Sequence, residues 1–358
     1  MWAPLIRKTA LAALMATLAC GHALAEVAEG ALPVDGGPKR ASKVGALPRC
    51  QGAPQCRPSF IARLKHAPFP LQANDDGTGR SFFNEIDRES GLRVRVNRHG
   101  DRYPEPKHYA DPSVLFHIPA SFDRTKPFRL VVFFHGHQST LERYVVGRIG
   151  LTRQVDASGA NVILIAPQLA KDAIDSHPGK LIRPGALARM LDECADVLAR
   201  TLGADMAARL ARAPVVLVAY SGGYLALAAG LAEAETGDGG FVDRIAGIVM
   251  LDAVFGNLSR IDAWLQARVG RVFLVSLFGK LSVSWTLDLI YRWEARGQPY
   301  GQLLPARLER GSIVVMQVST DHEAIATDGP PRDPLAAILR RLPPPAPTRV
   351  ERNPLTQP

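Results

Sequence analysis

Residues 215–224 constrain the fold of this chain more than any other stretch. They read Val-Val-Leu-Val-Ala-Tyr-Ser-Gly-Gly-Tyr, and an Ala/Leu-rich segment follows. A β-branched apolar run that ends at a serine between small residues is typical of a buried strand, a very tight turn and a helix. A turn this sharp requires small residues at Ala219 and Gly223, and it strains the backbone of Ser221 so that its hydroxyl projects beyond the sheet. The pattern is Gly-x-Ser-x-Gly with alanine in the first position, and a plain strand–turn–helix with a surface serine is the alternative interpretation.

Strand-like and helix-like segments alternate around this turn. Helical patterns cover residues 141–158 and 185–202, the segment after Ser221 and a segment near Trp264. Continuous Val/Ile/Leu runs are typical of strands that helices cover on both faces. We therefore predict an α/β domain over residues 81–342, with a doubly wound, mostly parallel eight-stranded sheet and helices on both faces. The expected strands are 92–97, 114–118, 129–134, 161–166, 215–219, 245–251, 272–277 and 313–318. The aromatic segment 281–305 is a candidate lid or substrate wall.

The N-terminus has the pattern of a secretory signal peptide over residues 1–25. Arg7 and Lys8 precede a short apolar stretch, and Ala23-Leu24-Ala25 offers a cleavage site near Ala25. An uncleaved anchor is the alternative, and lipidation at Cys20 is a weaker one. We therefore expect export to the periplasm or beyond, with no stable membrane insertion after the signal is removed.

Two further segments flank the expected domain. Residues 26–80 are rich in Pro, Gly and basic residues and predict a flexible N-terminal arm, and residues 343–358 predict a Pro-rich tail. Cys50 and Cys56 bracket a short loop, which in an oxidising compartment predicts a disulfide. Cys194 lies in an amphipathic helical pattern and is expected to be a buried apolar residue.

Composition and motifs exclude several classes of function. The formal charge is +9, but Lys and Arg are scattered along the 358 residues without an aromatic-interleaved basic stripe, so no nucleic-acid partner is expected. No glycine-rich phosphate loop follows the first strand, and no zinc quartet is present, so we expect no cofactor and no metal. A metal site on His135 and His137 lacks a third ligand.

Chemically competent residues stand where the expected strands end. His135-Gly136-His137-Gln138 follows the strand 129–134. Ser221, Asp252 and His322 each follow a later strand, in that chain order. In a parallel sheet the carboxyl ends of the strands meet at one edge, where functional groups collect.

With these motifs the chain resembles the α/β-hydrolase superfamily over residues 81–342, through Ala-Tyr-Ser-Gly-Gly, the His-Gly pair and the late histidine. The family order of nucleophile, acid and base is kept. The resemblance implies Ser221 as nucleophile, His322 as base and Asp252 as the orienting acid. It also implies an oxyanion hole from the N–H of Gly222 and a second donor, His137 or Gln138.

The acid is the least determined of these residues. The usual place for it follows the seventh strand, where residues 278–282 contain no carboxylate and Asp288 is the next acid. Asp252, after the sixth strand, is preferred, and Asp288 is the alternative. The polar residues Asp172, Asp175, His177 and Lys180 form a loop that either overhangs the pocket or is merely solvated.

These features predict an exported serine hydrolase that acts through an acyl-enzyme on a small-molecule or envelope-derived acyl substrate. Carboxylic esters are the favoured substrates. An amidase or peptidase acting on envelope material would use the same residues, and a non-catalytic binding protein that keeps the fold is the alternative outside enzymes.

Overall fold

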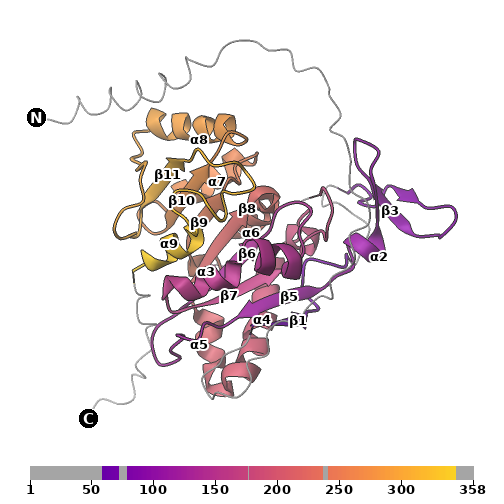
Figure 1. Ribbon diagram of the computed structural model, residues 1–358, viewed down its shortest axis with the longest axis horizontal. Coiled ribbons are helices and arrows are strands. Elements are labelled where there is room, and N and C mark those ends of the chain that lie inside the picture. The colour runs from indigo at the N-terminus through magenta and orange to yellow at the C-terminus, as the bar shows by residue number, and fades with distance from the viewer. Residues whose placement is uncertain (1–58, 72–78, 176, 237–240, 344–358) are drawn as a thin grey trace, which may run out of the picture. The chain divides into compact units, whose positions relative to one another are not determined.

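An eight-stranded, mostly parallel sheet is the core of the domain (Figure 1). The computed structural model describes residues 59–71, 79–175, 177–236 and 241–343. The strands from β6 to β11 run parallel, while β5 runs antiparallel to both of its neighbours, β1 and β7. This is the α/β-hydrolase fold that the sequence predicted. In spatial order the strands are β1 (Ser59–Arg63), β5 (Ser113–His117), β7 (Val162–Pro167), β6 (Arg129–Phe134), β8 (Val215–Tyr220), β9 (Ile245–Leu251), β10 (Phe273–Phe278) and β11 (Ile313–Gln317).

The side chains of successive residues in the central strands pack alternately into two separate hydrophobic cores. In β6, Val132 and Phe134 belong to the core on one face, whereas Val131 and Phe133 belong to the core on the other. This follows from the two-residue period of a strand. Full burial of each such side chain contributes about 1.5–3 kcal/mol, which is why most positions in these strands are apolar.

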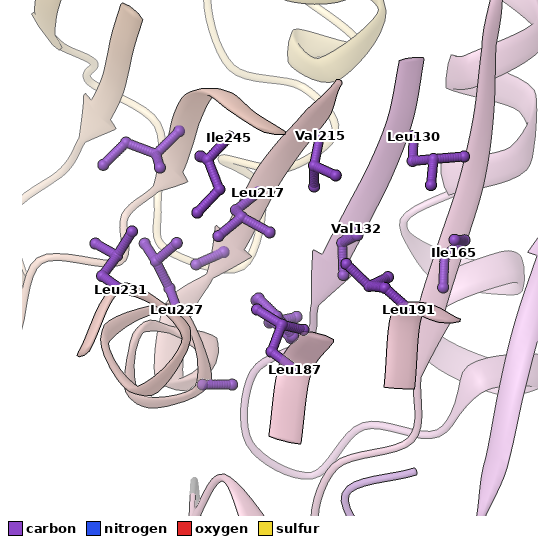
Figure 2. Close-up of a cluster of buried hydrophobic side chains, with 14 of the residues drawn as sticks. Leu130, Val132, Ile165, Leu187, Leu191, Val215, Leu217, Leu227, Leu231 and Ile245 are labelled. Atoms are coloured by element: carbon purple, nitrogen blue, oxygen red, sulfur yellow. The ribbon is translucent and has the colours of Figure 1, made fainter. Parts of the chain in front are cut away.

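Helices cover both faces of the sheet. Figure 2 shows how Leu187 and Leu191 of α4, with Leu227 and Leu231 of α6, meet the strand side chains of one face. That face carries α4 (Ala186–Leu202), α5 (Ala207–Arg212), α6 (Tyr224–Thr236), α7 (Leu258–Gln266) and α8 (Val283–Ala295). The other carries the π-helical segment η1 (Leu141–Arg148), α3 (Leu151–Ser158) and α9 (Pro334–Arg340). The short 3-10 segments are η2 (Gly179–Ile182), η3 (Ala204–Met206), η4 (Ser221–Gly223) and η5 (Val242–Arg244).

A small antiparallel sheet lies outside the main one. It consists of β2 (Glu85–Ile86), β3 (Arg93–Val96) and β4 (Arg102–Pro104), and the short helix α2 (Glu105–His108) follows. Its support is a third apolar cluster, in which the rings of Phe69, Phe82 and Tyr109 contact one another and Ala170 and Ala173. The cluster joins the small sheet to the loop that follows β7.

Two expectations about the strands need correction. The stretch 92–97 forms β3 of the small sheet, not a strand of the main sheet. The main sheet begins instead at β1, inside the stretch 26–80 that was expected to be a flexible arm, so the domain starts before residue 81. Strand β1 was missed because it is a half-exposed edge strand, anchored by the stacking of Phe60 on Phe116 at 5.1 Å.

Other predictions about the chain meet the structure only in part. The helix expected over 141–158 is interrupted at Gly150, whose φ of 63° is left-handed. Cys194 is buried in α4 as a free thiol, and burial raises its pKa. Cys50, Cys56, the expected signal peptide and the Pro-rich tail after residue 343 lie outside the described residues. Within the part of the chain that the structure describes, no helix combines the length and apolarity that a bilayer crossing requires.

Candidate active site

Ser221 stands at a strained turn between β8 and α6. Its φ is 51°, in the left-handed region that residues other than glycine seldom adopt. The turn brings Gly223 against β6, where a Cβ would lie 2.2 Å from the carbonyl oxygen of Phe134. Only glycine fits there, whereas Ala219 is fully buried in the sheet and its methyl is accommodated. The strand–turn–helix predicted from the sequence therefore has the expected strain at its serine.

A continuous line of hydrogen bonds joins Ser221, His322 and Asp252. The Nε2 atom of His322 lies 2.7 Å from the Oγ of Ser221, and the Nδ1 atom of the same ring lies 2.6 Å from the Oδ2 of Asp252. The three residues follow β8, β11 and β9, so the shared carboxyl edge of the sheet brings them together. With its proton on Nδ1, His322 donates to the carboxylate and accepts from the serine hydroxyl.

Asp252 is held in place from its other oxygen as well. It is 1 % exposed, and its Oδ1 accepts hydrogen bonds from the N–H of Gly279, at 2.9 Å, and from the hydroxyl of Ser282. Burial opposes ionisation, but the hydrogen bonds from His322, Gly279 and Ser282 outweigh it and lower the pKa of Asp252. Asp252 is thus an ionised acceptor with both oxygens engaged. Sequence reasoning noted that the loop after β10 lacks a carboxylate but missed that it supplies these donors.

Asp288, the alternative acid, takes no part in this arrangement. It is exposed on α8, in a shallow cavity with Arg260 and Arg292. The carboxylate that contacts His322 is that of Asp252.

Aromatic side chains fix the orientation of the His322 ring. Tyr220 stacks on it with ring centroids 5.4 Å apart, and Phe255 meets it edge-on at 5.9 Å. The hydroxyl of Tyr220 also donates to the carbonyl of His322, at 3.2 Å. Tyr144 extends this contact, because its hydroxyl lies 3.2 Å from that of Tyr220. None of these aromatic contacts was predicted, although Tyr220 directly precedes the serine in the sequence.

The loop after β6 passes directly beside Ser221. A Cβ on Gly136 would lie 2.8 Å from the Cβ of Ser221, so the loop approaches this closely only because residue 136 is glycine. The N–H of Gln138 donates to the carbonyl of Ala173 at 2.8 Å, and it is therefore unavailable to an oxyanion. Within the described residues the N–H of His137 has no such acceptor, which favours His137 over Gln138 as the second donor. Gly222 is buried in the first turn after Ser221, where helix N–H groups lack intrahelical acceptors.

A buried histidine shapes this loop from within. His135 is fully enclosed, and its Nδ1 donates to the carbonyl of Gly136 at 2.8 Å. Its Nε2 accepts from the Gln168 side chain at 2.8 Å and from the N–H of Leu169 at 2.9 Å. Burial lowers the pKa of His135 to about 4, so the ring is neutral at ordinary pH. His135 is thus a structural residue of the loop.

A cavity of about 780 Å³ opens over Ser221 and His322. Arg95 of β3 and Arg98, in the turn between β3 and β4, line its wall, so the small sheet reaches this site. From the polar loop after β7, Asp175 lines the cavity and accepts from the Tyr109 hydroxyl at 3.1 Å.

The other members of that polar loop do not line the cavity. Asp172 pairs with Arg143 at 2.6 Å. Lys180 donates to the carbonyl of Lys65 at 2.7 Å, and the His177 ring packs on Phe82. Among the described residues, no group of three or more His, Cys, Asp or Glu side chains has a geometry that would hold a metal ion.

Known proteins match this chain in the path of the backbone rather than in sequence. No family model and no curated protein matches the sequence. Among solved structures, a ferulic acid esterase is 13% identical, with a TM-score of 0.42 over 70% of this chain and 95% of that one. A feruloyl esterase module from Clostridium thermocellum is 11% identical, with a TM-score of 0.41 over 70% of this chain and 87% of that one. An S-formylglutathione hydrolase from Agrobacterium tumefaciens is 8% identical, with a TM-score of 0.37 over 66% and 90%. TM-scores this low identify neither a substrate nor an activity.

Proposed function

We propose that this α/β-hydrolase-fold protein is a serine hydrolase that cleaves carboxylic esters through an acyl-enzyme on Ser221. The observation that carries the proposal is the line of hydrogen bonds of 2.7 Å and 2.6 Å from Ser221 through His322 to Asp252. A strained serine, an imidazole next to its hydroxyl and a buried carboxylate behind the imidazole are the three parts that activate a hydroxyl nucleophile.

The reaction follows from these positions. The Oγ of Ser221 attacks the acyl carbon while Nε2 of His322 removes its proton, and Asp252 stabilises the imidazolium that forms. The imidazolium then protonates the departing alkoxide oxygen as the C–O bond breaks. A water molecule, deprotonated in turn by His322, then attacks the acyl carbon. The bond from that carbon to Oγ breaks, the imidazolium returns its proton to the Oγ of Ser221, and the acid is released.

Negative charge develops on the carbonyl oxygen in both steps. The N–H groups of Gly222 and His137 are the donors proposed to stabilise it. Gly222 follows Ser221 directly, and Gly136 brings the His137 loop against the serine. Each such donor contributes about 10²–10³-fold to the rate in comparable enzymes.

Esters are favoured over amides on chemical grounds. An ester carbonyl is less stabilised by resonance than an amide carbonyl, and its alcohol leaves more readily than an amine, so the first step is easier. The test is labelling with a fluorophosphonate probe, mapping of the labelled residue by mass spectrometry, and a panel of matched ester and amide substrates. Labelling at Ser221 with ester turnover is the expected result, and Ser221→Ala is the control that should abolish both. A folded protein whose Ser221 stays unlabelled would indicate a binding protein instead, and faster amide cleavage would indicate an amidase or peptidase.

We also propose that the enzyme is exported and that its acyl substrates are small molecules or envelope components. The support is the signal-like pattern of residues 1–25 and the spacing of Cys50 and Cys56. Non-reducing mass mapping of protein from the native host should find Glu26 as the first residue and the two cysteines linked. Free thiols at both positions would contradict the oxidising compartment.

A further inference from the structure

A second cavity, of about 930 Å³, lies at the end of the sheet opposite to the candidate active site. Arg129 is the first residue of β6, Phe273 is the first residue of β10, and Arg244 directly precedes β9. All three line this cavity at the amino ends of parallel strands. Ser221, Asp252 and His322 follow the carboxyl ends, so the cavity belongs to a different site.

The cavity is strongly basic. Seven arginines line it, against the two acids Asp243 and Glu309. The arginines are scattered in the sequence between positions 129 and 310, and only the fold gathers them. Within the described residues none of the seven is within 4 Å of a carboxylate oxygen, in contrast to Arg153 or Arg296 elsewhere on the molecule.

Arg129 is the most constrained of these side chains. It is 8 % exposed, and its buried Nε has no hydrogen-bond partner in the described residues. Burial, with the nearby charge of Arg310, lowers its pKa to about 10, so it remains a cation at neutral pH. A buried cation without a partner destabilises a folded chain, and an anion in the cavity would remove that cost.

Two of the other guanidinium groups, those of Arg244 and Arg268, contact neutral partners. Arg244 lies over the Phe241 ring, and its Nε donates to the carbonyl of Ala213 at 3.1 Å. Arg268 lies 5.1 Å from the centroid of the Trp264 ring. Carbonyls and aromatic faces orient these groups, and the acids that act on them, Asp192 on Arg244 and Asp243 on Arg268, form no ion pair with them within 4 Å in the described part of the chain.

Several guanidinium groups around one cavity suit phosphate better than any neutral ligand. Each presents a planar fork of N–H donors that matches two phosphate oxygens, and the combined charge favours a multiply charged anion. We propose that this cavity binds an anion with two or more linked phosphate groups. The proposal is independent of the esterase proposal, because it uses no residue of the Ser221 site.

The first experiment measures binding of sodium tripolyphosphate by isothermal titration calorimetry and by the shift in Tm. Citrate and sulfate at matched ionic strength are the comparison anions. We expect one tripolyphosphate per chain, a rise in Tm, and much weaker responses to citrate and sulfate. An equal response to all three at matched ionic strength would overturn the proposal, because it would show only nonspecific screening.

Variants then locate the site. Arg271 and Arg310 are exposed, so the double variant R271Q/R310Q should fold normally while its affinity for tripolyphosphate falls at least about tenfold. The matched control is R200Q/R332Q, which removes two exposed arginines that do not line the cavity. Equal losses in the two double variants would refute this location.

Arg129→Met separates ligand binding from a structural role. Removing a buried, unpartnered charge should leave the Tm of the free protein unchanged or higher, while the Tm rise with tripolyphosphate shrinks. A lower Tm with an undiminished ligand shift would show that Arg129 is structural and would count against the proposal.

Flotation with phosphatidylglycerol vesicles, against phosphatidylcholine vesicles, distinguishes a lipid headgroup from a free phosphate. We expect tripolyphosphate to bind and vesicles not to bind. Vesicle binding without any response to tripolyphosphate would overturn a cavity site for linked phosphates. Fluorophosphonate labelling of R271Q/R310Q should equal that of the unaltered protein, which keeps this test separate from the esterase test.

Discussion

Replacing Asp252 with asparagine should abolish most of the proposed activity, because it moves the proton of the His322 ring from Nδ1 to Nε2. In the structure Oδ1 of Asp252 accepts two hydrogen bonds, from Gly279 and Ser282, while Oδ2 faces His322. The carbonyl oxygen of an asparagine must therefore take the Oδ1 position, because only an oxygen accepts from both donors. Its NH₂ group then points at Nδ1 of His322. An imidazole that accepts at Nδ1 carries its proton on Nε2, where it cannot take the proton of the Ser221 hydroxyl.

The size of the effect follows from this tautomer. In serine hydrolases with the same arrangement, the wrong tautomer lowers kcat by about 10⁴-fold, which corresponds to about 5 kcal/mol of transition-state stabilisation. The fold should be little affected, because both donors to Oδ1 keep an acceptor. The loss of charge assistance in two hydrogen bonds should reduce the free energy of unfolding by no more than about 3 kcal/mol.

The assay is steady-state hydrolysis of the best ester in the panel, with the folded fraction of each variant measured by circular dichroism. Asp288→Asn is the matched control. Its side chain is exposed on α8, so kcat/KM should stay within about twofold of the unaltered value. The reasoning is refuted if Asp252→Asn keeps more than about a tenth of kcat/KM, or if Asp288→Asn loses activity instead.

Three further outcomes follow from the contacts around the site. Gly136→Ala places a methyl 2.8 Å from the Cβ of Ser221 and should lower kcat about 100-fold. Gly301→Ala is the control, because the atoms nearest to its added methyl are 3.8 Å away, and it should leave kcat unchanged. The same ester assay tests both. Ser282→Ala removes a donor that helps lower the pKa of Asp252. A carboxylate with a depressed pKa stabilises the fold above its unfolded pKa and loses that contribution as pH falls through its folded pKa. In the Ser282→Ala variant acid unfolding should therefore begin at a higher pH than in the unaltered protein. A circular dichroism titration in which the onset of acid unfolding stays the same would contradict this. The pKa of His135 is about 6.5 in the unfolded chain and about 4 in the folded protein. The free energy of unfolding should therefore fall by about 3 kcal/mol as the pH is lowered from 6.5 to 4. His135→Phe should lack that pH dependence in denaturant titrations.

The sequence was most informative about the central strands. All six residues of β6 are buried, and so are all six of β8, which is why continuous apolar runs identified them. Strand β1 escaped detection because none of its five residues is fully buried and its sequence lies in a Pro/Gly-rich stretch. The pattern at 92–97 correctly predicted a strand, but alternation is a local property and does not specify which sheet a strand joins.

The site was predictable where it depends on strand order and unpredictable where it depends on the path of loops. Ser221 and His322 were paired because the carboxyl ends of parallel strands share an edge. The N–H of Gln138 is engaged by Ala173, a residue 35 positions later in the chain, and no local pattern reports such a contact. The roles of Gly279 and Ser282 likewise exist only because their loop folds over a carboxylate from another strand.

The choice between two positions for the acid has a geometric reason that only the register of the sheet reveals. Strands β9 and β10 are parallel neighbours, and Leu251 at the end of one pairs with Leu277 at the end of the other. The N–H of Asp252 donates to the carbonyl of Leu277 at 2.7 Å, and a left-handed φ of 44° turns the chain at Asp252. Its carboxylate thereby enters the loop after β10, within 2.9 Å of the N–H of Gly279. An acid that follows β9 thus occupies the space that an acid after β10 would fill, so an imidazole after β11 meets a carboxylate in the same place from either strand.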